Sequence, residues 1–368
     1  MSQSLSLLYL FGESAERDAD PWRRRALQLM TAFGGRARQV AAVDKLPNGV
    51  PATLAQNPPP LSGAVSVARY EAIARAMRGY DLVLSFGAGA IDAVMARRAF
   101  PRGAPPIVHH EDPAAMTSGG SARLYRRIAL GAAAGLVVAG KGAAEAAAGC
   151  WKVAAARLHT IADGVDLSAF ARGPDTKTVA GFRRKPGEVA IGIMLDGASD
   201  DELALLVRAV AGLAARFRLV VVGEGDGRAA VERTALAMGI DDRLVLPGAL
   251  SPGAAWLGGL DVLLLPLRLA PAPAIVIEAM AAGVPVMALR GGAVEVLLAP
   301  DNRALLSAHA AEVSLRDALQ PLASDATLRA ATGAANRAQA LAVYDVAAMI
   351  ARSAAVYSDA IGRPALLG

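Results

Sequence analysis

Residues 218–250 read RLVVVGEGDGRAAVERTALAMGIDDRLVLPGAL, and residues 260–297 read LDVLLLPLRLAPAPAIVIEAMAAGVPVMALRGGAVEVL. Each stretch begins with a short apolar run, passes through a turn rich in glycine or proline, continues for the length of a helix and returns to an apolar run. Strands that alternate with helices in this way predict a parallel sheet with helices on its faces.

The same alternation extends over the rest of the chain. Helix-length segments separate the apolar runs, which predict strands at 5–10, 37–43, 81–86, 106–110 and 135–139, and again at 189–195, 218–223, 243–248, 261–266 and 284–289. The sequence therefore predicts an α/β protein with two Rossmann-like, doubly wound parallel sheets. A length of 368 residues agrees with two domains.

A polar, basic segment rich in glycine and proline, GPDTKTVAGFRRKPGE at 173–188, has the composition of an exposed connector. We place an N-terminal Rossmann-like domain at 1–175 and a C-terminal one at 186–330. The Ala-rich remainder, 331–368, is predicted to be helical and to pack back on the N-terminal domain. Ligands of such sheets bind at the carboxyl ends of the strands, so the site is expected in strand-to-helix loops.

Charge is distributed unevenly along the chain. The first 180 residues hold 21 Lys and Arg against 14 Asp and Glu, whereas the remainder holds 17 against 19. A basic first half indicates an anionic partner, either a phosphorylated substrate or a membrane surface, although a solvated arginine-rich surface explains it equally well. Nucleic acid is disfavoured, because aromatic residues make up only 4% and do not alternate with the basic ones.

Several other classes of protein lack support in the sequence. No apolar run has the ~18 residues of a membrane span, and the first residues lack the features of a signal peptide, so we expect a cytoplasmic protein. One cysteine and no cluster of cysteine and histidine indicate neither a structural metal nor a disulfide. Neither GxSxG nor a Walker-type phosphate loop is present.

The two stretches quoted first closely resemble the nucleotide-sugar-binding half of family 4 glycosyltransferases. In the first half, YDLVLSFGAG, PIVHH, GLVVAG and IADGVDLSAF resemble the same family. The resemblance is strong from about 218 to 298, moderate from 80 to 170 and weak before residue 80. It implies the GT-B architecture, in which two Rossmann-like domains face across a cleft. It also implies transfer of a sugar from a nucleotide diphosphate, with retention, without a bound metal or other cofactor.

The resemblance assigns donor-binding residues in the second half. Glu278 matches a glutamate that accepts hydrogen bonds from ribose hydroxyls, a task that suits a carboxylate because it offers only acceptors; a glutamate that merely favours a helix N-terminus is the alternative. Gly223, Glu224 and Gly225 match a loop near the base and diphosphate, where glycine permits close backbone approach. A simple tight turn explains these glycines equally well.

In the first half, His109 and His110 end a predicted strand where the family has a histidine that faces the sugar and the acceptor. Two adjacent histidines out of four in the chain are informative at such a position, although a structural role is the alternative. Glu111 and Asp112 follow at once. They are predicted to orient a histidine or contact the acceptor, or else to cap a helix.

The chain also departs from the family. Ala270 stands where the partner glutamate of Glu278 is expected, and the following Gly-Phe-Gly is replaced by Pro271, Ala272 and Pro273; proline has no N–H to donate. Spacing places Asp196 and Asp201 where the family has an arginine and a lysine that neutralise the diphosphate. Arg268 and Arg228 are the nearest substitutes, and both are equally compatible with a surface role.

Two hypotheses follow. The first is an active, metal-independent transferase whose partners are a nucleotide-sugar donor and a glycan or lipid-linked acceptor of a cell-surface polysaccharide or glycolipid. Its basic first half would place it peripherally at the anionic inner face of the membrane. The second is a catalytically inactive relative that binds a partner enzyme or a glycan.

Overall fold

The structure is a computed structural model, and it describes residues 5–12, 21–111, 119–171, 182, 184–195, 197–250, 256–266, 274–292 and 294–363. Its contacts divide the chain into two compact units. The first unit comprises residues 1–164 and 346–368, and the second comprises residues 165–345. Most of the predicted connector at 173–188 lies outside the described residues, so that prediction stays open.

The first unit contains a parallel sheet of seven strands in the order β3-β2-β1-β4-β5-β6-β7. The strands are β1 (Leu5–Phe11), β2 (Ala37–Ala42), β3 (Thr53–Leu54), β4 (Leu82–Phe86), β5 (Ile107–Glu111), β6 (Gly135–Val138) and β7 (Leu158–Thr160). The central strands are buried along their whole length, as expected where helices cover both faces of a parallel sheet.

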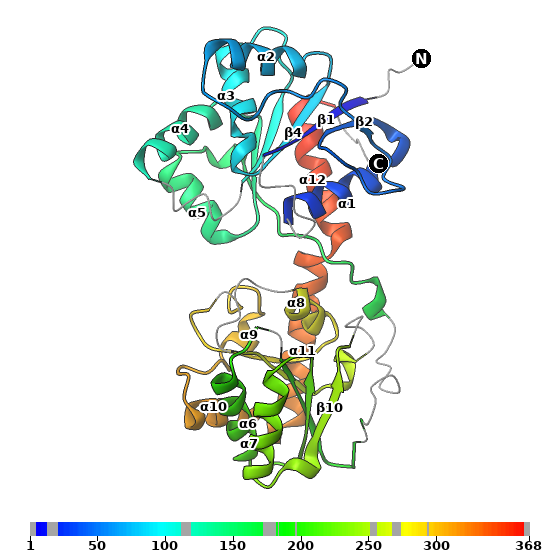
Figure 1. Cartoon of the computed structure of the whole chain (residues 1–368), viewed down its shortest axis with the longest axis vertical. Helices are drawn as coiled ribbons and strands as arrows, with labels where there is room; N and C mark the ends of the chain where they lie inside the picture. The colour runs from blue at the N-terminus through cyan, green and yellow to red at the C-terminus, as the bar shows by residue number, and fades with distance from the viewer. Residues whose placement is uncertain are drawn as a thin grey trace. The chain divides into compact units, whose positions relative to one another are not determined.

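Helices cover both faces of this sheet (Figure 1). One face packs against α1 (Pro21–Phe33) and α12 (Val346–Ile361), and the other packs against α2 (Val67–Met77), α3 (Ile91–Ala99), α4 (Gly120–Leu130) and α5 (Lys141–Cys150). Successive strand residues enter opposite cores; Leu7 packs with α1 and α12, whereas Leu8 packs on the other side. The last helix of the chain therefore completes the core of the first unit.

The second unit contains a parallel sheet of five strands in the order β10-β9-β8-β11-β12. The strands are β8 (Val189–Met194), β9 (Phe217–Val222), β10 (Leu244–Gly248), β11 (Val262–Leu264) and β12 (Val286–Met287). Its helices include α6 (Asp200–Ala211), α7 (Gly227–Ala237), α8 (Ala274–Ala281), α9 (Pro300–Arg303), α10 (Glu312–Ser324) and α11 (Ala326–Gln339). All ten predicted strands are present, and the two-sheet α/β prediction is confirmed; β3 and β7 were not predicted.

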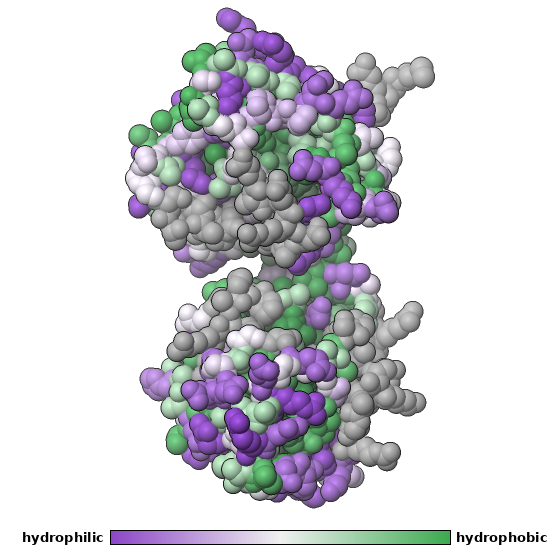
Figure 2. Space-filling view, in the orientation of Figure 1, coloured by the Kyte–Doolittle hydropathy of each residue, from purple (hydrophilic) through white to green (hydrophobic). Residues whose placement is uncertain are grey.

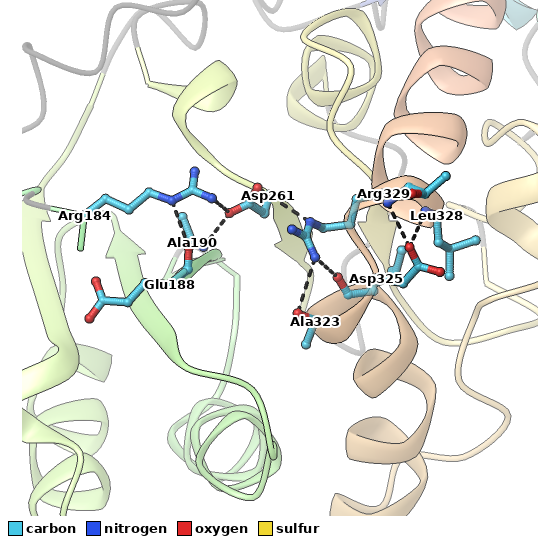
Figure 3. A network of polar contacts seen from close by, with 10 residues as sticks. Arg184, Glu188, Ala190, Asp261, Ala323, Asp325, Leu328 and Arg329 are labelled. Atoms are coloured by element: carbon cyan, nitrogen blue, oxygen red, sulfur yellow. Dashed lines mark hydrogen bonds and ion pairs between the residues drawn. The ribbon is translucent and has the colours of Figure 1, made fainter. Parts of the chain in front are cut away.

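A polar network joins the start of β8 to the helices α10 and α11 (Figure 3). The carboxylate of Asp261, just before β11, accepts a hydrogen bond from the Ala190 N–H at 2.8 Å and pairs with Arg184 at 2.6 Å. Its other oxygen lies 3.6 Å from Arg329 of α11. These contacts close the amino edge of the second sheet, and the opposite edge carries the loops where ligands of such sheets bind.

The strand order reverses between β1 and β4 in the first sheet and between β8 and β11 in the second. Helices that leave on opposite sides of such a reversal open a crevice at the carboxyl ends of the strands. The residues after β1, β4, β5, β8 and β11 are therefore the candidates for function. No helix in the described part of the chain is long and apolar enough to cross a bilayer.

Candidate functional site

Three predicted site residues, His109, His110 and Glu111, form the carboxyl end of β5 and are completely buried. Because strand side chains alternate, His109 and Glu111 lie on one face of the sheet and His110 lies on the other. The contacts described below confirm this division. Asp112, which follows them, lies outside the described residues.

Both ring nitrogens of His109 have partners inside the first unit. Its Nδ1 lies 2.9 Å from the Ser85 hydroxyl of β4, and its Nε2 lies 3.2 Å from Glu111 Oε2. An ionised carboxylate only accepts, so we assign the Nε2 proton to the hydrogen bond with Glu111, and Nδ1 pairs with the Ser85 hydroxyl, which can both donate and accept. This network fixes the orientation of the ring.

Glu111 also pairs with Arg126 of α4, whose Nε lies 3.2 Å from the same oxygen. The Arg126 guanidinium lies 5.9 Å from the ring centre of Trp151. Burial alone would raise the pKa of Glu111, but the hydrogen bonds and charges of His109 and Arg126 outweigh it and lower the pKa below its ordinary value. Glu111 is thus a buried carboxylate that stays ionised.

His110 lies in an aromatic cage on the opposite face. Its ring stacks on Phe86 at 4.4 Å between centres, and Trp22 and Tyr357 contact it edge-on. Its Nε2 lies 2.9 Å from the Tyr357 hydroxyl, while its Nδ1 has no partner among the described residues. Burial, aided by the charges of Arg25 and His109, lowers the pKa of His110 well below its ordinary value, so the ring is neutral.

The loops after β1 and β4 touch at a position that the sequence did not reveal. A Cβ placed on Gly12 would lie 2.6 Å from Gly89 Cα, and the Gly12 N–H donates to the Phe86 carbonyl at 3.3 Å. Two backbones can approach this closely only without side chains. Gly12 and Gly89 therefore bring the loops after β1 and β4 into contact, next to the strand that carries His109 and His110.

In the second unit, the predicted glycine turn follows β9 at the carboxyl edge. Gly223 and Gly225 adopt φ values of +129° and +138°, which only glycine adopts readily. The Gly223 N–H donates to the Gly248 carbonyl at 3.0 Å, and the Glu224 carboxylate accepts from the Ala249 N–H at 3.3 Å. The turn is thus tied to the end of β10.

Glu278 lies on α8, the helix that follows β11 at the strand reversal. Its side chain is half-buried, and burial raises the pKa of its carboxyl above the ordinary value. No hydrogen bond or ion pair to this carboxylate is found among the described residues. Partial burial disfavours the charged form of this carboxylate, and a ligand that donates two hydrogen bonds would favour it.

The positions expected to balance a diphosphate are only partly described. Asp201 lies in the first turn of α6 with Asp200 and Glu202, where acidic side chains favour the helix N-terminus. Ser199 and Glu202 form a capping box on the same helix. Arg228 of α7 pairs with Glu232 at 3.1 Å. The remaining positions lie outside the described residues: Asp196, Arg268, Ala270, Pro271 and Pro273.

Within the described part of the chain, no group of three His, Cys, Asp or Glu side chains is arranged to hold a metal ion. The structure therefore brings together His109, Glu111, Ser85 and Arg126 in the first unit. In the second unit it brings the glycine turn to the end of β10, and it gives Glu278 no partner among the described residues. The functional roles predicted for these residues stay predictions.

Comparison with protein families gives a match in the second unit. A model described as glycosyl transferases group 1 matches residues 188–325, which lie within the second unit. A search of curated proteins found no significant match.

Solved structures resemble the whole chain. HepE from Anabaena, in complex with UDP, has a TM-score of 0.63 at 16% identity, with 96% of this chain and 100% of HepE covered. A glycosyltransferase from Rickettsia africae has a TM-score of 0.66 at 12% identity, with 98% and 99% covered. A UDP-N-acetylglucosamine 2-epimerase has a TM-score of 0.55 at 14% identity, with 98% and 97% covered.

Identities this low show the fold alone, and the same fold serves more than one reaction. The narrower assignment to family 4 stays a prediction. The two parallel sheets with their flanking helices are those of the GT-B fold, and the match to the group 1 glycosyltransferase model is confined to the second unit.

Proposed function

We propose that this chain is a glycosyltransferase that takes a sugar from a nucleotide-diphosphate donor and transfers it, with retention, to a cell-surface polysaccharide or glycolipid. The observation that carries the proposal is Glu278, a half-buried carboxylate without a described partner. It lies at the strand reversal, in the segment matched by the glycosyltransferase model. HepE was crystallised with UDP, which supports a UDP-sugar as the donor.

In this proposal the second unit binds the nucleotide. Glu278 accepts hydrogen bonds from both ribose hydroxyls, and the raised pKa of its carboxyl reports the burial that such binding would compensate. The turn at Gly223, Glu224 and Gly225 has no Cβ at its two glycines, so its backbone can approach the base and the phosphates. Arg268 and Arg228 are the cations proposed to meet the diphosphate.

The first unit is proposed to bind the acceptor. Glu111 is ionised and is held by His109 and Arg126, so it can orient His109 toward an incoming sugar. His109 and His110 keep their proposed role at the reacting sugar, with the neighbouring Asp112 at the acceptor. Both rings are buried in the free protein, and contact with substrate therefore requires the adjacent loops to admit it.

The acidic first turn of α6 favours a second candidate, a catalytically inactive protein that binds a partner or a glycan. At an effective dielectric near 20, two charges about 4 Å apart interact by about 4 kcal/mol. Asp200, Asp201 and Glu202 lie in the first turn of α6, where the resemblance to glycosyltransferases leads us to expect cations beside a diphosphate. In that case the loss of the residues expected at Ala270, Pro271 and Pro273 would have removed the chemistry and kept the fold.

The proposed acceptor also suggests where in the cell the chain acts. The excess of basic residues in the first 180 supports peripheral attachment to the inner face of a membrane, where anionic lipids attract such surfaces. A lipid-linked acceptor would be presented there.

Slow hydrolysis of the donor tests the proposal without knowledge of the acceptor. The purified chain is incubated with UDP-, GDP- and ADP-sugars, and the released sugar and its anomeric configuration are followed by NMR. We expect release from one donor class with retention, and loss of that release in Glu278→Ala. Binding of a nucleotide without turnover of any of its sugar donors would instead favour the inactive protein.

A further inference from the structure

A groove of about 800 Å³ lies at the β3 edge of the first sheet. Its walls come from β2 and β3, from residues 55–60, and from the second half of α2 with the turn that follows it. β2 and β1 separate this edge from β4 and β5, and Arg38 and Tyr80 come from the amino ends of β2 and β4. The groove is thus distinct from the His109 site at the carboxyl end of β5.

Three arginines line the groove: Arg38, Arg75 and Arg78. No aspartate or glutamate is among the described residues that line it. Arg75 pairs at its rim with Glu71, one helical turn earlier, at 3.0 Å, and both side chains are largely exposed. The surface near α2 mixes hydrophilic and hydrophobic residues (Figure 2). The groove therefore has a net positive charge.

Arg38 lacks the local structural role that explains the other two arginines. Arg75 and Arg78 end α2, where cations favour the helix C-terminus. Arg38 belongs to the other wall, on β2, and has no such role. Its guanidinium carbon lies 5.6 Å from the Tyr80 ring centre, and its Nε donates to the Ser6 hydroxyl at 3.3 Å. These neutral contacts orient the charge without cancelling it.

The other residues that line the groove suit a ligand that carries hydroxyl groups. Gln56 and Asn57 supply amides that both donate and accept, whereas Val40, Ala72 and Ala76 supply small apolar contacts. The volume lies within the range of ~300–1,000 Å³ typical of small-molecule sites. Guanidinium groups pair with phosphate in a bidentate manner, which favours phosphate over a diffuse anion.

We propose that this groove binds a phosphorylated saccharide, with Arg38, Arg75 and Arg78 at its phosphate and Gln56 and Asn57 at its hydroxyls. The site does not depend on the transferase proposal, since none of its residues belongs to the donor or acceptor site described above.

Calorimetric titration of the full chain with glucose 6-phosphate tests this proposal, with glucose and inorganic phosphate as comparison probes. We expect glucose 6-phosphate to bind more tightly than either. The double variant Arg75→Ala/Arg78→Ala should lower its affinity roughly tenfold, as expected for the loss of exposed, charge-assisted hydrogen bonds. Glu71→Gln should raise the affinity, because it releases Arg75 from its ion pair.

Arg102→Ala is the matched control, because Arg102 is exposed in the same unit and does not line the groove. It should bind glucose 6-phosphate as the wild type does. Equal losses in Arg102→Ala and in the double variant would overturn the proposal, since they would indicate general surface charge. If inorganic phosphate binds as tightly as glucose 6-phosphate, the saccharide part of the proposal is wrong. If the chain binds only vesicles that contain phosphatidic acid, the groove binds a membrane and not a saccharide.

UDP titrated into the same samples separates the two proposals. If a variant loses glucose 6-phosphate binding but binds UDP as the wild type does, the substitution affects the groove and not the proposed donor site. A fold defect would instead weaken the binding of both ligands and lower the thermal unfolding midpoint. In that case the variant Arg75→Lys/Arg78→Lys decides, because it keeps both charges but loses the bidentate geometry. Its affinity for glucose 6-phosphate should lie between those of the alanine double variant and the wild type, and an affinity as low as that of the alanine variant in a folded protein would contradict the phosphate assignment.

Discussion

The Nε2 atom of His109 lies 3.2 Å from Oε2 of Glu111, and neither side chain is exposed to solvent. The carboxylate also meets Arg126, and the other nitrogen of the ring meets Ser85. The end of β5 is therefore held by a connected polar network that links β4, β5 and α4. In such a network the loss of one member leaves its partners buried and unsatisfied.

Glu111→Gln should destabilise the first unit, because it leaves the Arg126 charge without its partner. Breaking a buried ion pair in this way costs about 3–5 kcal/mol. Chemical denaturation followed by circular dichroism measures the loss. Glu145→Gln, which removes one member of an exposed pair with Lys141, is the control and should unfold at the wild-type midpoint. Equal stabilities of the two variants would show that the buried pair contributes nothing.

Glu111 should also make the free energy of unfolding depend on pH in the acid range. Its pKa is lower in the folded chain than the ordinary value of 4.5, so the unfolded chain takes up the proton first as the pH falls. The stabilisation is complete above the ordinary pKa and is lost as the pH falls through the lowered one. Unfolding measured across this acid range should show a shallower slope in Glu111→Gln than in the wild type.

His110 should act in a different pH window. Its folded pKa lies well below the ordinary 6.5, so from about that pH downward the unfolded chain binds a proton that the folded chain excludes. The free energy of unfolding should therefore fall as the pH drops below 6.5. Replacement with a residue that does not titrate, His110→Phe, should remove this part of the pH dependence. A variant with the wild-type slope between neutral pH and the carboxyl range would contradict the assignment.

Gly333 of α11 should not tolerate a side chain. A Cβ there would overlap the carbonyl oxygen of Gly283, which follows α8 in a left-handed conformation with φ +78°. Gly333→Ala should destabilise the second unit by about 3 kcal/mol or more, since backbone must move to make room. Gly142→Ala meets no atom within 4 Å, and at the second residue of α5 it should change stability by no more than ~0.5 kcal/mol. Thermal unfolding of both variants measures the contrast.

The sequence was sufficient for ten strands, because each of the predicted apolar runs forms a strand of one of the two sheets, and most of these strands are largely buried. It was insufficient for β3, which has only two residues, both exposed, and for β7, whose three residues are at most half-buried. Neither strand has an apolar run to reveal it. Hydrophobic runs reveal buried strands, and these two short edge strands are mostly not buried.

The sequence showed where the candidate residues lie in the fold better than it showed their surroundings. His109 and His110 lie at the end of a strand as expected, whereas Glu111, expected in the loop that follows, is the last residue of β5. The sequence also does not show that Ser85, Arg126 and Tyr357 contact these residues from distant elements. The close approach of Gly12 to Gly89 also joins residues far apart in the chain. By contrast, the capping box of Ser199 and Glu202 is formed by residues close in the sequence. It marks the start of α6 and so explains an acidic residue at Asp201, which the comparison by spacing did not explain.

The most direct test of the account is calorimetric titration of UDP, GDP and ADP into the wild type, Glu278→Gln and Glu312→Gln. Glu312 pairs with Arg208 at 3.3 Å near the end of α6 and serves as the control. We predict that one nucleotide, UDP, binds to the wild type and to Glu312→Gln. In Glu278→Gln an amide donor replaces one acceptor, and affinity should fall roughly tenfold or more. Failure of every nucleotide to bind, or equal affinity in Glu278→Gln, would contradict the donor site proposed for the second unit.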